Sequence, residues 1–306
     1  MGNGRWDAGD WAGYAKAHVS GKSASAVFTS RGMKDAYDPA KIGFRESRDS
    51  ADNPLSTPLI LASDVTGSMG MVAHNLMRDG LNTIATEIYD RKPITDPHIM
   101  VMAVGDAYMD SAPIQMTQFE ADIRLADQVR ELYVEGGGGG NGGETYTMAW
   151  LAAALKVRAD AFEKRKRKGY LFTIGDEPMV DIIRKDQITR FLGVEASGDV
   201  PAAEALRMAS RDWEVFHIVL ANEGYCRHGC DEVLRNWRAV LPERTIRLED
   251  VSKLAETVVS LVQVNEGANA ASVASSWDGS TGLVVRNALA DLTAGGRAAA
   301  GVRRLR

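Results

Sequence analysis

The chain contains few cysteines and lacks a long apolar run. Only Cys226 and Cys230 occur among its 306 residues, which is too few for a disulfide framework and suits a reducing compartment. No apolar stretch approaches the roughly 18 residues that a membrane-spanning helix needs. The N-terminal segment also lacks the apolar part of a signal peptide, and Trp6 stands where a myristoylation motif requires Ser or Thr. We therefore expect a cytoplasmic protein without a membrane anchor.

An excess of positive charge is also missing. The 36 Lys and Arg residues are outnumbered by 41 Asp and Glu residues, so the formal net charge is −5. Without an overall basic field, nucleic acid is not favoured as a partner. The basic run at 164–168 fits a solvated cap at the C-terminus of a helix better than a nucleic-acid patch, because cations complement that end of the helix dipole.

The two cysteines flank His228 in the string Cys226-Arg-His-Gly-Cys230. This string offers three ligands to zinc. A structural zinc site usually has four ligands, and the sequence contains no second cluster. A plain loop is therefore the favoured interpretation, with zinc binding as the alternative.

What the sequence does contain is a regular alternation of apolar runs and helix-periodic segments from residue 58 onward. Long continuous apolar runs indicate strands buried on both faces, as in a parallel sheet. The expected strands are 58–64, 98–106, 169–176, 214–221 and 244–248, with a short edge strand at 114–117. The expected helices are 72–89, 119–133, 146–162, 182–192, 202–210, 232–240 and 251–264. This order predicts an α/β fold with a doubly wound, mostly parallel, Rossmann-like sheet and helices on both faces.

The two ends of the chain differ from this central region, 58–264. Residues 1–57 combine scattered aromatic residues with the charged stretch 45–52, and we expect them to wrap the domain and anchor through the aromatics. The charged stretch is interpreted as a solvated linker with local ion pairs, far from the carboxyl edge of the sheet. Residues 265–306 are rich in Ala, Gly and Ser and end in several arginines, so we expect a mobile tail with one short helix at 283–292.

Three loops carry side chains suited to binding a hard divalent cation. The first strand ends on Asp64-x-Thr66-x-Ser68. A glycine-rich loop, 135–145, delivers Thr145 to the start of a helix, and the strand 169–176 ends on Asp176. Because right-handed crossovers bring such loops to the carboxyl edge of a parallel sheet, we expect them to gather there together with Asp106.

The three motifs, in this order, resemble the von Willebrand factor A (vWA) domain with its metal-ion-dependent adhesion site. That family has D-x-[ST]-x-S after the first strand, a Thr in a glycine-rich loop and an Asp after a later strand. The resemblance implies metal ligands at five positions: Asp64, Thr66, Ser68, Thr145 and Asp176. It implies that Thr and Ser bind the ion directly and that the Asp side chains act largely through water. Neighbouring or alternative groups are Asp106, Glu144 and Glu177, the last of which follows Asp176 where the family usually has Gly.

Such a site is suited to binding a partner rather than to catalysis. Mg²⁺ takes six oxygen ligands, and hydroxyl ligands leave its charge poorly compensated. A helix N-terminus near Ser68 further favours an incoming anion. We therefore expect a non-enzymatic protein-binding module that uses Mg²⁺, or Mn²⁺ or Ca²⁺, to bind an Asp or Glu of a protein partner. The resemblance suggests an AAA+ ATPase or a multi-protein complex as that partner.

Other interpretations remain open. Asp and Ser at a strand-to-helix turn can serve only as helix caps. A phosphate-binding loop needs Lys after its glycines, whereas Glu144 follows here. A metal-dependent hydrolase or phosphotransferase would use Asp64 as nucleophile, but position 66 is Thr rather than the second Asp of such enzymes. An assembly protein in which the ion only stiffens the loops is the third alternative.

Overall fold

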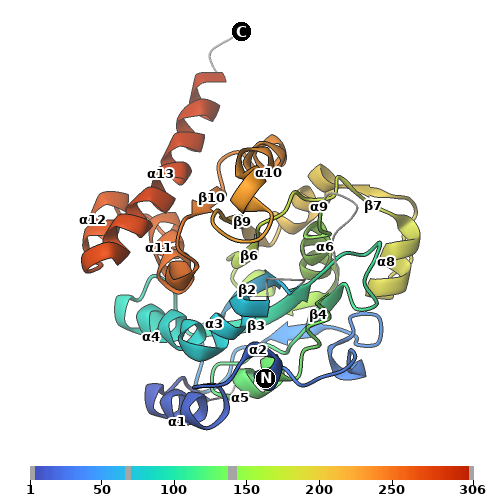
Figure 1. The fold of residues 1–306 in the computed structure, drawn as a ribbon, viewed down its shortest axis with the longest axis horizontal. Coiled ribbons are helices and arrows are strands. Elements are labelled where there is room, and N and C mark those ends of the chain that lie inside the picture. The colour runs from blue at the N-terminus through green and yellow to red at the C-terminus, as the bar shows by residue number, and fades with distance from the viewer. Residues whose placement is uncertain (1–3, 66–69, 137–142, 303–306) are drawn as a thin grey trace.

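The protein is described by a computed structural model in which residues 4–65, 70–136 and 143–302 are placed (Figure 1). Its centre is a six-stranded sheet in the order β10-β9-β6-β2-β3-β4. The first five strands are mutually parallel, and β4 runs antiparallel to β3 at one edge. The strands are β2 (Thr57–Asp64), β3 (Pro97–Val104), β4 (Ile114–Met116), β6 (Gly169–Gly175), β9 (Trp213–Leu220) and β10 (Thr245–Leu248). The prediction of a mixed α/β fold with a mostly parallel sheet is confirmed.

The central strands are buried on both faces because nearly every residue in them is apolar. Along β2, Leu59 and Leu61 belong to one core cluster, whereas Ile60 and Ala62 belong to a second one on the opposite face. This division follows from the two-residue period of a strand. The sheet therefore separates two hydrophobic cores.

Different helices contribute to each core (Figure 1). The cluster with Leu59 receives side chains from α1 (Ala8–His18), α3 (Gly70–Asn75), the π-helix η3 (Leu76–Gly80), α4 (Leu81–Arg91), α5 (Arg124–Arg130) and α11 (Leu254–Asn265). The cluster with Ile60 receives side chains from α6 (Thr147–Lys156), α8 (Lys185–Leu192), α9 (Ala202–Ala209) and α10 (Cys226–Val240).

The helix expected at 146–162 is interrupted, which corrects the sequence-based prediction. Helix α6 ends at Lys156, and the next three residues form β5 (Val157–Ala159) before the short helix α7 (Asp160–Glu163). Strand β5 pairs in parallel with β1 (Arg45–Ser47) from the N-terminal extension. Residues 157–159 are therefore extended rather than helical, because their backbone pairs with that of β1, a segment distant in the sequence. The basic run 164–168 consequently follows α7 and does not cap α6.

The two charged runs of the sequence pair with each other. Arg165 lies 2.6 Å from Asp49, and Arg48 lies 2.9 Å from Asp160. Arg165 also donates a hydrogen bond to the carbonyl of Ser56, just before β2 begins. The charged stretch 45–52 therefore lies at the amino end of β2, away from the carboxyl edge as predicted. It makes the expected local ion pair, Arg48 with Glu46 at 2.8 Å, and also ion pairs across the fold.

Several other boundaries differ from the expected ones. Helix α5 begins only at Arg124, because Glu120 instead bridges Ile99 in an extended conformation. Helix α8 begins at Lys185, after β7 (Ile182–Ile183) has paired with β8 (Val200–Pro201). Helix α11 is preceded by the short helix η4 (Val251–Lys253). Cys226, His228 and Cys230 lie in the first turns of α10, so the plain loop expected there is wrong.

The C-terminal region is more ordered than expected. Helices α12 (Ala270–Ser275) and α13 (Gly279–Val302) replace the single short helix, and α13 extends away from the body of the molecule (Figure 1). Val273, Val285 and Leu289 are buried in the first core cluster. Asp291 also accepts a hydrogen bond from the backbone N–H of Arg247 in the edge strand β10. The expectation of a mobile segment before residue 283 is therefore wrong, because α12 forms there and buries Val273 and Ala274.

The N-terminal extension packs by its aromatic residues, as expected. It also forms α2 (Ala24–Val27) and η1 (Asp35–Tyr37). Trp11, Phe28 and Tyr37 are buried in the first core cluster, and Trp6 stacks on Trp11 with ring centroids 5.2 Å apart. Within the described residues, no helix combines the length and the apolar character needed to cross a membrane.

Candidate functional site

Three acidic side chains lie where neighbouring strands end. Asp64 is the last residue of β2, Asp176 directly follows β6, and Asp106 lies two residues beyond β3. Strand β2 lies between β6 and β3 and is parallel to both, so these ends share one edge at a strand spacing of about 4.8 Å. The predicted gathering of Asp64, Asp106 and Asp176 at the carboxyl edge is confirmed.

The end of the glycine-rich loop is held against the segment that follows β6. The backbone N–H of Glu144 donates to the carbonyl of Pro178 at 3.0 Å, and the N–H of Val180 donates to the carbonyl of Glu144 at 3.1 Å. A Cβ atom at Gly143 would lie 2.7 Å from the Pro178 carbonyl oxygen, so only Gly fits this approach. These contacts bring Glu144, Thr145 and Tyr146 to the sheet edge.

Thr145 connects this loop to the loop that follows β3. Its hydroxyl accepts a 3.0 Å hydrogen bond from the backbone N–H of Ala107 and donates one of 3.3 Å to Oδ1 of Asp106. Asp106 also accepts from the N–H of Tyr108 at 2.9 Å. Two of the predicted site residues, Thr145 and Asp106, are therefore in direct contact.

Tyr146 connects the same loop to the end of β2, and sequence analysis missed it. Its hydroxyl donates a 2.7 Å hydrogen bond to Oδ2 of Asp64, and both side chains are buried. A Cβ atom at Gly175 would lie 2.0 Å from the Tyr146 hydroxyl, so the glycine before Asp176 makes room for this contact. The position of Tyr146, next to Thr145 at the start of an apolar helix, was the only signal in the sequence.

Glu144 differs from its neighbours because its carboxyl group is buried without a hydrogen bond. It is 1% exposed, and neither carboxylate oxygen has a hydrogen-bond partner among the described residues. Burial raises the pKa of Glu144 to about 10, and the charges of Asp64, Glu177, Asp106 and Asp110 add to this effect. Several acidic side chains therefore lie close enough together at this edge to raise the pKa of Glu144.

Asp176 and Glu177 occupy two different environments after β6. Asp176 accepts a hydrogen bond from the backbone N–H of Tyr225, directly before α10, so one of its oxygens acts as a helix cap. Burial raises the pKa of Asp176 despite that bond. Burial also raises the pKa of Glu177, with Asp176 and Asp106 adding to the shift. Asp176 is the residue that directly follows the last strand residue, Gly175.

The predicted ligands Thr66 and Ser68 lie outside the described residues. Within the described residues, no three His, Cys, Asp or Glu side chains form a group that could hold a metal ion. A site of the resembled kind relies on hydroxyl groups and on single carboxylates rather than on such a cluster. The orphaned carboxylate of Glu144 and the mutual repulsion of the acidic side chains fit a cation at this edge.

Three histidines are held by polar contacts within the fold. His217 is fully buried beneath the site, with Nδ1 3.0 Å from the hydroxyl of Thr173, and burial lowers its pKa well below the usual value. His98 Nδ1 lies 3.0 Å from the hydroxyl of Ser47, and His74 Nε2 lies 3.0 Å from the carbonyl of Lys22. Each of these rings is therefore held by a contact within the fold.

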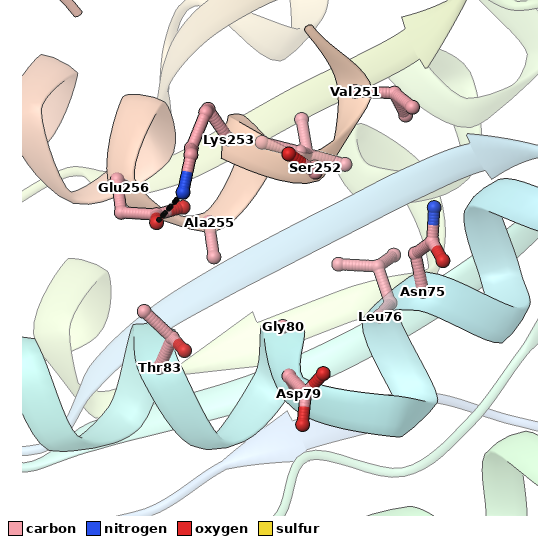
Figure 2. A pocket seen from close by; sticks show the side chains of 11 residues that line it. Asn75, Leu76, Asp79, Gly80, Thr83, Val251, Ser252, Lys253, Ala255 and Glu256 are labelled. Carbon is pink, nitrogen blue, oxygen red and sulfur yellow. Dashed lines mark hydrogen bonds and ion pairs between the residues drawn. The ribbon is translucent and has the colours of Figure 1, made fainter. Parts of the chain in front are cut away.

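A cavity of about 350 Å³ lies between two helical segments (Figure 2). Asn75, Asp79 and Thr83 line it from one side, and Ser252 and Lys253 line it from the other. Lys253 forms an ion pair with Glu256 at 3.3 Å within its own segment. No predicted site residue lines this cavity, so it belongs to the packing of α4 against α11.

Comparisons with known proteins do not place the chain in a family. No family model and no curated protein matches it. Among solved structures, it is similar to the pilus adhesin SpaC from Lactobacillus rhamnosus GG in its open conformation, with a TM-score of 0.48 and 9% sequence identity. The match covers 72% of this chain and 31% of the adhesin, and a second SpaC structure gives the same score with 32% of the adhesin covered. The chain thus spans about a third of the adhesin's length, and this distant likeness assigns no function to it.

Proposed function

We propose that this chain is a doubly wound vWA-type domain that binds a divalent cation at the carboxyl edge of its sheet and uses it to bind a protein partner. The observation that carries the proposal is the convergence of Asp64, Asp106 and Thr145 through the hydrogen bonds of residues 145 and 146. These hydrogen bonds bring the first motif, which begins at Asp64, next to the second, which contains Thr145. Asp176 brings the third motif to the same edge.

The residues that would hold the ion are Asp64, Thr66, Ser68, Thr145 and Asp176. When bound, the ion would supply a positive charge with a coordination position open to an anion. Thr145 contributes by orientation: its proton points to Asp106, which leaves a lone pair of the hydroxyl for a cation. An Asp or Glu of the partner is the anion that this arrangement favours, and an AAA+ ATPase or a multi-protein complex is the kind of partner that the resemblance suggests.

A binding role is favoured over phosphotransfer. As a nucleophile, Asp64 would need access to substrate, yet it is 1% exposed and already accepts the hydrogen bond from Tyr146. A general acid two residues later is also lacking, because position 66 is Thr. These two features make a non-enzymatic module the better proposal.

The ion can be tested with the purified chain. We expect calorimetric titration to show Mg²⁺ or Ca²⁺ binding that the Asp64→Asn variant loses, because Asn keeps the shape but removes the charge. Glu249→Gln is the matched control, since Glu249 also lies just beyond a strand end but is exposed. Unchanged binding in Asp64→Asn would exclude this site.

The role of the ion in partner binding needs a second test. Proteins retained by the immobilised chain in Mg²⁺ should be released by EDTA and should fail to bind the Asp64→Asn variant. Retention that ignores both EDTA and the substitution would refute the metal-mediated version. Ion binding that stabilises the fold without changing partner retention would support the loop-stiffening alternative instead.

A further inference from the structure

The carboxyl group of Glu144 lies at the same edge of the sheet but is not among the proposed metal ligands. Both oxygens of its carboxyl lack a hydrogen-bond partner within the described part of the chain, and the residue is 1% exposed. Buried polar groups are almost always hydrogen-bonded, and a buried carboxyl without partners is costly to the fold. A bound ligand that contacts the carboxyl oxygens would offset this cost.

The other acidic residues at this edge are each held by a donor. Asp64 accepts from Tyr146, Asp106 accepts from the N–H of Tyr108, and Asp176 accepts from the N–H of Tyr225. Their carboxylates are thereby fixed in place. Glu144 alone among these four has a carboxyl without such an anchor.

The backbone of Glu144, in contrast, is fixed. Its N–H and its carbonyl are both hydrogen-bonded to the segment 178–180. The residue is therefore held at the edge by its backbone, with its buried carboxyl left unpaired among the described residues.

The surrounding charges define the chemistry of that ligand. The charges that act most strongly on Glu144 come from Asp64, Glu177, Asp106 and Asp110, all of which are acidic. A cation is the ligand that relieves this repulsion. Ca²⁺ accepts six to eight oxygens, several of them carboxylates, in variable geometry, whereas Mg²⁺ requires a strict octahedron and usually takes only one or two carboxylates.

We propose that the Glu144 carboxylate is itself a ligand of the ion at this edge and makes the site selective for Ca²⁺ over Mg²⁺. This inference rests on the proposed function, which supplies the ion site. It adds an anionic ligand, directly before Thr145, to the ligand set that the resemblance implies.

The test measures binding of Ca²⁺ and of Mg²⁺ separately, by calorimetry on the full chain after removal of metal with EDTA. Four proteins are compared: the wild type, Asp64→Asn, Glu144→Gln and the control Glu249→Gln. In the wild type we expect Ca²⁺ to bind about tenfold or more tightly than Mg²⁺. Glu144→Gln should weaken Ca²⁺ binding by about 10–100-fold, since one anionic ligand is lost, and should affect Mg²⁺ much less.

The outcomes separate this inference from the proposed function. If Asp64→Asn abolishes binding while Glu144→Gln keeps both the Ca²⁺ affinity and the preference, the role of Glu144 is overturned and the ion site stands. If the wild type binds neither ion, both proposals fail. Circular dichroism of metal-free Glu144→Gln establishes that it folds, and Glu144→Asp, which keeps the charge on a shorter side chain, should recover part of the Ca²⁺ affinity.

Discussion

The hydroxyl of Tyr146 donates a 2.7 Å hydrogen bond to the carboxylate of Asp64, although 82 positions separate the two residues in the chain. Both side chains are buried, and the bond joins the loop before α6 to the last residue of β2. Burial raises the pKa of Tyr146 well above its usual value, and the charge of Asp64 adds to the shift, so Tyr146 remains a proton donor. This contact fixes the residue that begins the first sequence motif.

Removing this bond should destabilise the protein. A hydrogen bond to a charged group contributes about 1.5–3 kcal/mol, so we expect Tyr146→Phe to lower the free energy of unfolding by roughly that amount. Urea unfolding at pH 7 measures it. Tyr108→Phe is the control, because the Tyr108 side chain is exposed and its hydroxyl makes only a 3.3 Å bond to a carbonyl. Equal losses in the two variants would contradict the argument.

Gly175 should be intolerant of a side chain. A Cβ atom there would lie 2.0 Å from the Tyr146 hydroxyl and 2.5 Å from its ring carbons, which sit in a filled core. We expect Gly175→Ala to cost about 1–3 kcal/mol of stability through overpacking. Gly198→Ala is the matched control, since a Cβ atom at Gly198 meets nothing within 4 Å. Thermal unfolding of the two variants checks this, and a Gly175→Ala variant as stable as the control would argue against the observed packing.

Glu144 should make the metal-free protein less stable as pH rises. Its folded-state pKa is about 10, above the ordinary value of 4.5, so its favourable contribution is complete below pH 4.5 and declines as pH rises toward 10. The decline has a slope of at most about 1.4 kcal/mol per pH unit. In EDTA, Glu144→Gln should therefore gain stability relative to the wild type as pH rises from 5 to 8, by up to about 4 kcal/mol over this range. Urea midpoints over this range test it, and a constant difference between the two proteins would be evidence against a buried, unpaired carboxyl.

Asp160 should show the opposite dependence on pH. Although burial acts to raise it, the hydrogen bonds from Lys164, Arg48 and the N–H of Asp49 lower the pKa of Asp160 to about 2. A lowered pKa means that the stabilisation is present above the ordinary value of 3.8 and is lost as pH falls toward 2.

Asp160→Asn should consequently cost about 1–2 kcal/mol at pH 7 and progressively less below pH 4, as measured by urea unfolding. Asp186→Asn serves as the control, because Asp186 is exposed and pairs only with its neighbour Arg184, so its unfolding midpoint should stay unchanged. A loss for Asp160→Asn that does not shrink in acid would mean that packing, rather than charge, is responsible.

The hydroxyl of Thr145 should be needed for stabilisation by the ion. Thr145→Val leaves the N–H of Ala107 without its acceptor and removes the proposed oxygen ligand, so it should cost about 1–3 kcal/mol and also lose the rise in melting temperature caused by Ca²⁺ or Mg²⁺. Thr145→Ser keeps the oxygen and should keep that rise. The melting temperature with and without the ion, in both variants, gives the result. An ion-induced rise that survives in Thr145→Val would remove Thr145 from the ligand set.

The long central strands β2, β3, β6 and β9 could be predicted from the sequence because each is a continuous apolar run that is buried on both faces. The prediction for β2, 58–64, differs from the observed strand by one residue at its start. Helices were harder, since their limits depend on distant partners. Lys156 ends α6 because β1 pairs with the residues that follow, and Glu120 remains extended because it bridges Ile99. Neither contact can be predicted from the helical periodicity of the sequence.

The sequence by itself determined the α/β class, the mostly parallel character of the sheet and the gathering of Asp64, Asp106 and Asp176 at one edge. These follow from local patterns, since a strand end in a parallel sheet has only one edge to occupy. Only the tertiary structure decided that Tyr146 holds Asp64, that Thr145 joins Asp106 and that the carboxyl of Glu144 is buried without a partner. Hydrogen bonds and burial of this kind arise between segments far apart in the chain, so the spacing of residues along it cannot reveal them.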